Sequence, residues 1–139
     1  MIDVAAVRTA VAVVARAALV GADRGQVPVY EVVPDGSPAW PAVVLGMPSW
    51  RPGPTGCFDE YGLPVAVIVS DNGTSRESAQ RELDLLWPIV LGGLQQAITE
   101  DQTLGGAVVE CHVTSAEYGT FAVGAAGMPA QNITLTIHG

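Results

Sequence analysis

Prolines restrict where this chain can form helices, because most of them lie in one stretch and few lie in the segments on either side of it. Seven of the ten prolines lie between residues 28 and 54. Proline removes a backbone N–H donor and fixes φ, so it suits turns and strand edges better than helix interiors. We therefore expect short strands and loops from residue 27 to residue 62, and helices only in the flanking segments.

The N-terminal segment 2–20 contains no proline or glycine, and it predicts a helix that stops at Gly21. Asp3, Arg8 and Arg16 are spread through it, whereas a secretory signal needs a basic start and an uninterrupted apolar middle. We expect a helix of the mature fold and no membrane span. Apolar residues three and four apart predict its buried stripe: Val4, Val7, Val11, Val14 and Ala18.

The segment from residue 74 predicts a long central helix. Thr74 and Glu77 have the spacing of a capping box with Thr74 as the N-cap, and the helix is expected to end near Thr99. Pro88 predicts a kink or a division into two shorter helices, and Gly92-Gly93 adds flexibility or close packing. The predicted buried stripe is Ala79, Leu83, Leu86, Val90, Leu94 and Ala97.

Apolar segments rich in β-branched residues predict five strands, at 27–33, 42–46, 63–70, 107–117 and 131–138. Strands joined by turns and flanked by two helices are typical of an α+β fold, here one domain over residues 1–139. We expect an antiparallel or mixed sheet of about four to five strands, with the N-terminal helix and the central helix packed on it.

Two connections stand out in this scheme. The stretch 47–62 is predicted to be an irregular loop, and aromatic residues with arginine in a loop are typical of a protein contact. The alternative is a loop that folds back and caps the core. The connection 118–129 is rich in glycine and has room for one more short strand. The predicted contact residues are Trp50, Arg51, Phe58, Tyr61 and Phe121.

The charge balance argues against specific nucleic-acid binding. The chain has 14 acidic residues, six arginines and no lysine, and its formal net charge is −8. A phosphate-binding surface needs clustered cations, whereas these arginines are scattered along the sequence. An acidic surface repels DNA, which suits a pore through which DNA slides.

Few residues are available for catalysis or metal binding. The chain has only two cysteines, Cys57 and Cys111, and two histidines, His112 and His138. These are too few for a disulfide scaffold or a four-cysteine zinc site. The sequence does not decide whether Cys57 and Cys111 form a disulfide. His112 lies near Glu110 on a polar strand face, but no nucleophile neighbours it in the sequence. Glycine-rich phosphate loops and the Gly-x-Ser-x-Gly motif are absent. We expect a solvated His112, a fraying His138, an inert buried Cys111, and no enzyme, cofactor or metal.

Short segments follow one another along nearly the whole chain: Val27-Pro-Val, Pro41-Ala-Val-Val-Leu-Gly, Glu82-Leu83-Asp84, Thr103-Leu104-Gly105-Gly106 and Tyr118-Gly119. In this order, and in its alanine-, proline- and valine-rich, lysine-poor composition, the chain resembles the tail-terminator and tail-completion proteins of long-tailed bacteriophages. The resemblance implies an α+β domain that forms a ring, usually a hexamer, on the head-proximal end of the tail tube. Such a ring stops tube polymerisation and presents the surface that joins the head.

The resemblance also implies the partners. They are further copies of the chain, the tail tube protein and the head–tail connector protein, with DNA passing through the lumen without specific binding and with no membrane. The place would be the tail of the virion, after assembly in the host cytoplasm. Two alternatives stay open. One is another neck or minor tail protein of related fold, and the other is a small cytosolic ligand-binding domain with the 47–62 loop as its lid.

Overall fold

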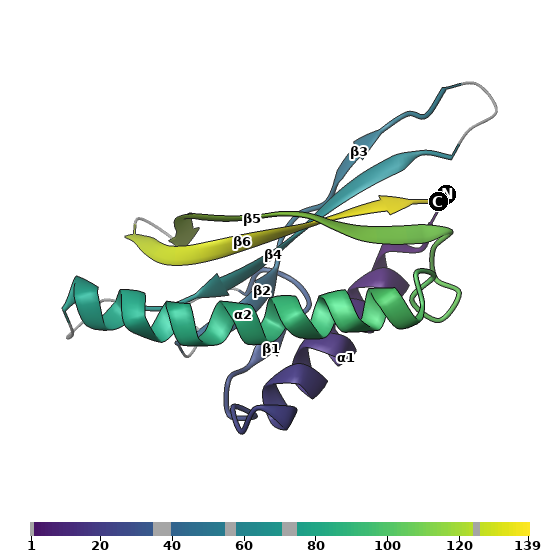
Figure 1. The fold of residues 1–139 in the computed structure, drawn as a ribbon. Helices are drawn as coiled ribbons and strands as arrows, with labels where there is room; N and C mark the ends of the chain where they lie inside the picture. Colours follow the sequence, from purple (N-terminus) through teal and green to yellow (C-terminus); the bar gives the residue numbers. More distant parts are fainter. Residues whose placement is uncertain (1, 35–39, 55–57, 71–74, 124–125) are drawn as a thin grey trace.

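Two helices pack against one face of a six-stranded mixed sheet in the computed structural model, which describes residues 2–34, 40–54, 58–70, 75–123 and 126–139 (Figure 1). The helices are α1 (Val4–Gly21) and α2 (Arg76–Glu100). The strands are β1 (Val29–Tyr30), β2 (Ala42–Leu45), β3 (Ser49–Arg51), β4 (Glu60–Ile68), β5 (Glu110–Val123) and β6 (Ala126–His138). The predicted α+β class is confirmed, with one strand more than expected.

The sheet has the order β1-β2-β4-β6-β5, and β3 pairs with β4. The β1–β2 pair is parallel, and the other pairs are antiparallel. β4 pairs with β6 along its whole length, so β2 and β3 follow one another along its other edge. The strand predicted over 27–33 is shorter than expected, because Pro28 precedes it and Val32 and Val33 are exposed beyond it.

β5 and β6 form one long hairpin, paired from Glu110↔His138 to Val123↔Ala126. The prediction of a separate glycine-rich connection over 118–129 was therefore wrong. Glycine weakens a strand but does not prevent ladder hydrogen bonds, and here the pairing continues through Gly119 and Gly127. The free edge of β5 is interrupted by an irregularity between Val113 and Ser115, a feature that discourages unwanted strand pairing.

α1 is attached to the sheet by arginine side chains as well as by its apolar stripe. The Arg8 guanidinium donates to the Glu31 and Leu45 carbonyls at 2.6 and 3.2 Å, and Arg16 donates to the Val29 carbonyl at 3.0 Å. α1 is long and apolar enough to cross a membrane by length and composition alone. In this fold it packs on the sheet and on α2, with five residues buried: Val7, Val11, Ala12, Ala15 and Leu19.

α2 begins one residue later than predicted. Ser75 is the N-cap, since its hydroxyl accepts a hydrogen bond from the Ser78 N–H at 3.1 Å. Thr74, the predicted N-cap, lies outside the described residues. The helix runs unbroken through Pro88, so a division into two helices was wrong. The predicted stripe is confirmed except at its end, where Ile98 is buried in place of the half-buried Ala97.

The sheet has a core on each face. The main core lies between the sheet and the helices, and side chains alternating along β6 supply its centre: Ile133, Leu135 and Ile137. On the opposite face a smaller cluster contains Val44, Ala66, Ile68, Met128 and Ala130. Tyr30, Trp40 and Phe121 pack against this smaller cluster. Toward the other end of the same face, the sheet carries polar side chains.

Asp101 organises the turn between α2 and β5. Its carboxylate accepts hydrogen bonds from the Thr103 hydroxyl at 2.5 Å and from the Thr103 and Gly105 N–H groups at 2.9 Å. These bonds, the Thr103 hydroxyl above all, hold the pKa of the Asp101 carboxyl below its usual value. The predicted turn at Leu104-Gly105-Gly106 is confirmed, and all three residues have positive φ.

We expect Asp101→Asn to lower the melting temperature at neutral pH and to lose this effect in acid. A carboxyl whose folded pKa is lowered stabilises the fold above its unfolded pKa, near 3.8, and that stabilisation disappears as the pH falls through the lower folded value. Melting curves of both proteins, taken from neutral pH down to about pH 2, measure the difference. A difference that stays constant across this range would contradict the assignment.

Candidate protein-contact surface

β3, the start of β4 and the residues that continue them at 52–54 and 58–59 form an arm at one corner of the sheet, and the outer end of this arm projects past β6 (Figure 1). The prediction of an irregular loop over 47–62 was wrong at both ends, because 49–51 pair with 60–62 in antiparallel register. The arm is closed by the Gly53 N–H, which donates to the Asp59 carboxylate at 3.2 Å. Asp59 and Gly139 exchange two backbone hydrogen bonds at its base. Residues 55–57, including Cys57, lie outside the described part of the arm.

The arm presents large hydrophobic side chains to solvent. Trp50 is 58% exposed, Phe58 59% and Met47 79%. Arg51 is exposed beside them, with its guanidinium 3.9 Å from the Glu60 carboxylate. Aromatic residues, methionine and arginine are the residue types enriched in protein interfaces. Three of the five predicted contact residues, Trp50, Arg51 and Phe58, are therefore exposed on one projecting element.

Tyr61 lies inside the arm and supports it. Only 5% of Tyr61 is exposed, and it packs in the main core opposite Trp50 in the strand register. It lines an apolar hollow of about 340 Å³ with Val4, Pro48 and Trp50. Its hydroxyl is buried and has no hydrogen-bond partner among the described residues. A buried hydroxyl without a partner destabilises a fold, and no other described side chain offsets this cost at Tyr61.

Phe121 does not join the arm. It lies on β5 opposite Met128 in the register and packs half-buried against the smaller core cluster. The prediction grouped it with the other aromatic residues because all of them fell in segments thought to be loops. The strand pairing separates them, because Phe121 belongs to the far end of the β5–β6 hairpin.

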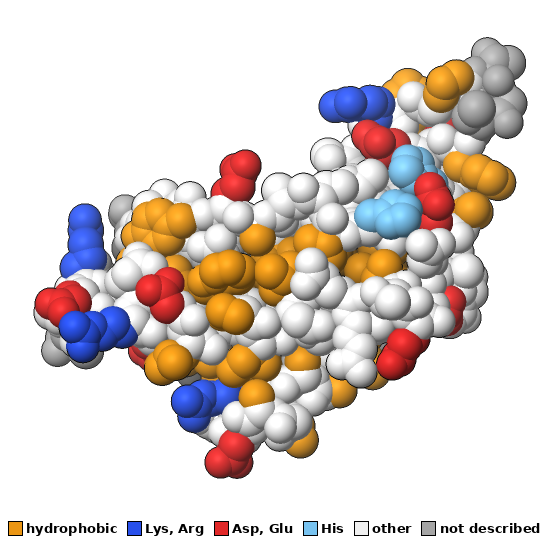
Figure 2. All heavy atoms as spheres, viewed as in Figure 1, with side chains coloured by type: hydrophobic (Ala, Val, Ile, Leu, Met, Phe, Trp, Pro, Cys, Tyr) orange, Lys and Arg blue, Asp and Glu red, His pale blue; other side chains and the backbone are white. Residues whose placement is uncertain are grey.

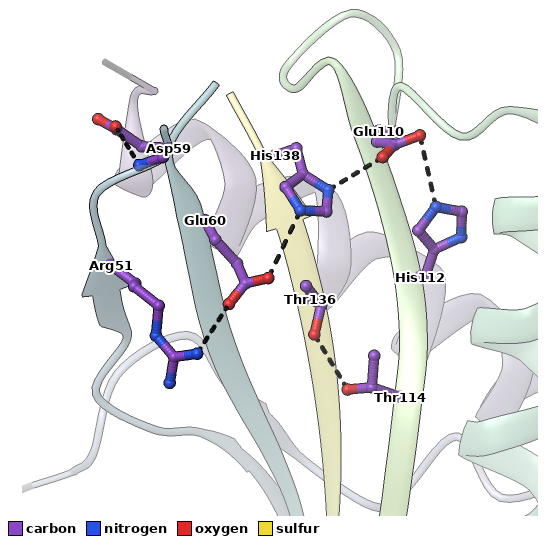
Figure 3. Close-up of polar contacts among 9 residues, drawn as sticks. Arg51, Asp59, Glu60, Glu110, His112, Thr114, Thr136 and His138 are labelled. Carbon is purple, nitrogen blue, oxygen red and sulfur yellow. Dashed lines mark hydrogen bonds and ion pairs between the residues drawn. The ribbon is translucent and has the colours of Figure 1, made fainter. Parts of the chain in front are cut away.

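A polar strip crosses four strands at the base of the arm (Figure 3). The Arg51 guanidinium faces Glu60 across β3 and β4, and His138 lies between Glu60 on β4 and Glu110 on β5. Nε2 of His138 is 3.6 Å from a Glu60 oxygen, and its Nδ1 is 3.0 Å from a Glu110 oxygen. Nε2 of His112 is 3.5 Å from the other Glu110 oxygen. Figure 2 shows both histidines beside acidic groups, next to the arm.

Sequence reasoning did not find the centre of this strip. His138 was expected to fray as the penultimate residue, whereas it pairs with both neighbouring strands and is 30% exposed at its side chain. The alternation of residues 131–138 placed His138 on the polar face, but only the register brings Glu60 and Glu110 to either side of it. His112 was expected to be solvated on the polar strand face near Glu110; its side chain is 44% exposed, and its Nε2 lies 3.5 Å from the Glu110 carboxylate.

The contacts of this strip are ion pairs between partly exposed side chains. The Nδ1 contact at 3.0 Å is poorly aligned for a hydrogen bond, so it acts as an ion pair once the imidazole is protonated. Exposed ion pairs contribute about 0–1 kcal/mol each, and these join β3, β4, β6 and β5 in a row. Among the described residues, no group of three or more histidine, cysteine or acidic side chains is arranged to hold a metal ion.

Cys111 is fully buried in the main core, as predicted. Burial raises the pKa of its thiol to about 11, because the thiolate would lose its hydration. A thiol of that kind is almost entirely protonated at neutral pH and therefore a poor nucleophile. Cys57, the residue that a disulfide with Cys111 would require, lies outside the described residues.

A groove of about 570 Å³ lies between the α1–β1 connection, residues 40–41 and the first half of α2. Its lining combines apolar residues, among them Pro28, Trp40 and Leu85, with the charged residues Arg24, Arg81 and Glu82. Arg81 is 2.6 Å from Glu77 on its own helix. Arg24 is half-buried and forms no ion pair with any residue the structure describes.

Comparison with protein-family models and with curated proteins found no match to this chain.

Proposed function

We propose that this protein is a structural component of a phage tail. In this proposal it caps the head-proximal end of the tail tube as a ring, ends tube polymerisation and forms the head–tail joining surface. The observation that carries the proposal is the arm, which exposes Trp50 on the paired strand β3 and Phe58 shortly before β4, with Met47 exposed shortly before β3. The sequence resemblance to tail terminators supplies the identity of the assembly.

The arm supports an assembly role because its exposure is costly in an isolated monomer. Large apolar side chains gathered on a projection typically mark an interaction site, and the strand pairing holds them in place. The neighbouring tube subunit and the next copy in the ring are the proposed partners. In this scheme the head–tail connector protein contacts the opposite face of the ring.

The net charge of −8 supports the proposed path of DNA. In a ring, copies of the acidic side chains would repeat around the lumen, and like charge repels phosphate. DNA would then pass without specific binding. We propose no enzymatic activity, no cofactor and no membrane. The proposed location is the head-proximal end of the virion tail, with assembly in the host cytoplasm.

The hollow beneath the arm favours a second candidate, a small ligand-binding domain. It is lined by Val4, Pro48, Trp50 and Tyr61, an apolar lining that suits an apolar ligand. A ligand that binds only the folded state raises the melting temperature in proportion to its occupancy. A thermal-shift screen of small apolar molecules tests this candidate, and Trp50→Ala should abolish any shift found.

The deciding experiment deletes the gene from its phage and images the lysate by electron microscopy. We expect filled heads beside unattached tails of uncontrolled length. Supplying the wild-type chain from a plasmid should restore attached tails, whereas Trp50→Ala should restore about tenfold fewer infectious particles. Val13→Ala is the matched control, because Val13 is 55% exposed on α1, away from the arm. Attached tails of normal length after deletion would overturn the proposal.

A further inference from the structure

The imidazole of His138 faces a carboxylate on each side. The strand register places Glu60 on β4 and Glu110 on β5 directly beside it, so the three side chains lie in a line across the sheet (Figure 3). Nε2 of His138 is 3.6 Å from the Glu60 carboxylate, and Nδ1 is 3.0 Å from the Glu110 carboxylate. Both ring nitrogens are therefore directed at negative charge.

A neutral imidazole suits only one of these two neighbours. It carries a proton on one ring nitrogen and a lone pair on the other. Whichever nitrogen of His138 holds the proton, the lone pair of the other nitrogen faces a carboxylate, and the two repel each other. The imidazolium carries a proton on both nitrogens and a positive charge, so both contacts become attractive. The arrangement of Glu60 and Glu110 is thus complementary to the protonated ring.

Solvent does not relieve the mismatch at Nδ1. This nitrogen is shielded from water and has no hydrogen-bond partner among the described residues, although the His138 side chain as a whole is 30% exposed. A buried polar atom without a partner destabilises a fold. A second proton on the ring turns this atom from an unpaired group into one half of an ion pair with Glu110.

The remaining charged groups of the polar strip continue the same line. The Arg51 guanidinium on β3 is 3.9 Å from Glu60, and Nε2 of His112 is 3.5 Å from Glu110. With both histidines protonated, positive and negative groups alternate from β3 to β5. Asp59 takes no part, because its carboxylate accepts a hydrogen bond from the backbone of the arm. α1 and α2 pack on the other face of the sheet, away from the strip.

We propose that His138 is a pH-sensitive link between the base of the arm and the β5–β6 hairpin. Histidine is the side chain that ordinarily changes its charge between about pH 5 and 8. In mild acid, the imidazolium attracts Glu60 at the start of β4 and Glu110 on β5 together. As the pH rises and the ring loses one proton, one of these attractions becomes a repulsion, and the base of the arm loosens.

The link has a lower limit of pH as well as an upper one. Glutamate is ordinarily ionised above about pH 5, so between about pH 5 and 8 the histidines are the groups of the strip that change charge. Below that range the carboxylates of Glu60 and Glu110 take up protons, and the attraction to His138 is lost. The arm is therefore held most firmly near the acidic end of the range. The inference goes beyond the proposed function and does not depend on a role in a tail.

Hydrogen exchange measured by mass spectrometry tests the link at the arm. The full-length wild type and His138→Gln are compared at the same pH, which cancels the effect of pH on the chemistry of exchange. At about pH 5.5 the amides of 49–54 and 58–62 should exchange roughly fivefold faster in His138→Gln, the factor that about 1 kcal/mol of ion pairing produces. Near pH 8 they should exchange no faster than in the wild type. A ratio that does not fall between the two pH values would overturn the proposal, because a purely structural role of His138 acts equally at both.

Two controls separate His138 from the rest of the polar strip. Glu60→Gln combined with Glu110→Gln removes both carboxylates, so adding His138→Gln to that background should leave no pH-dependent difference in exchange. His112→Gln is the matched histidine control, since His112 contacts Glu110 alone and does not reach β4. It should change the exchange of the arm by no more than about twofold at either pH. A pH-dependent effect of His138→Gln that persists without the carboxylates contradicts the link.

Thermal unfolding gives a readout that does not involve amide exchange. The wild type should melt above His138→Gln by a margin that is about 3 °C wider near pH 5.5 than near pH 8. Glu60→Gln, which leaves the imidazole with one carboxylate, should show the same trend at smaller amplitude, and it keeps the test available if His138→Gln does not fold. A margin that is equal at both pH values for both variants counts against the proposal.

Discussion

Leu135→Ala is expected to lower the free energy of unfolding by about 2–5 kcal/mol, a large fraction of the total stability of a domain of this size. Leu135 is fully buried at the centre of β6, between Leu63 on β4 and Val113 on β5 in the strand register. Removing its side chain loses the transfer free energy of the buried atoms and leaves a cavity under the helices. Urea unfolding followed by circular dichroism measures the change.

Leu85→Ala is the matched control, since it removes the same atoms from a residue that is 60% exposed on α2. Surface substitutions usually change stability by no more than about 0.5 kcal/mol. Similar losses at the two positions would contradict the placement of the main core between the sheet and the helices. The midpoint should shift without a change in the slope of the transition, because both variants keep the same folded surface.

Gly93→Ala is expected to destabilise the protein by about 1–3 kcal/mol. A Cβ built at Gly93 would lie 2.4 Å from the Cβ of Ala18, where α2 crosses α1. Alanine cannot move its Cβ away by changing rotamer, so the two helices must separate. This cost opposes the gain of about 1 kcal/mol that alanine brings to a helix through its higher propensity. Thermal and urea unfolding measure the net effect.

Gly92→Ala is the internal control for this prediction. A Cβ at Gly92 meets nothing within 4 Å, so only the propensity gain of up to about 1 kcal/mol remains. Adding Ala18→Gly to Gly93→Ala should recover stability beyond the sum of the single effects, which is the sign of direct coupling. Equal effects at Gly92 and Gly93, or strict additivity with Ala18→Gly, would show that the helices do not meet there.

Local rules predicted the elements well where side-chain periodicity was strong. The stripe of α2 and the alternation along residues 131–138 identified core residues before any pairing was known, because burial on one side leaves a period of 3.6 or 2 in the sequence. Errors occurred where pairing decided the structure. Three residues of β3 between prolines, and the glycine-rich halves of the β5–β6 hairpin, form strands because neighbouring strands supply their hydrogen bonds.

The candidate surface was predicted only in part. Aromatic residues in the 47–62 stretch indicated a contact, and the arm exposes Trp50 and Phe58. Tyr61 and Phe121 were predicted for the same reason, as aromatic residues in segments expected to be loops. They pack inward instead, since the strand register determines which face of the sheet each side chain occupies. The groove could not be predicted from the sequence, because its lining residues Arg24, Trp40 and Leu85 come from three separate segments of the chain.

By itself, the sequence determined the α+β class, the two helices, most of the buried face of α2, the inert Cys111 and the acidic character of the chain; of the stripe predicted for α1, only Val7 and Val11 are fully buried, with Ala12, Ala15 and Leu19 in place of Val4, Val14 and Ala18. These properties follow from periodicity, composition and single-residue chemistry, which act over a few neighbouring positions. Only the tertiary structure decided the arm, the polar strip around His138 and the Gly93–Ala18 crossing. Each of these depends on which distant segments lie side by side, and that is set by packing the whole core at once.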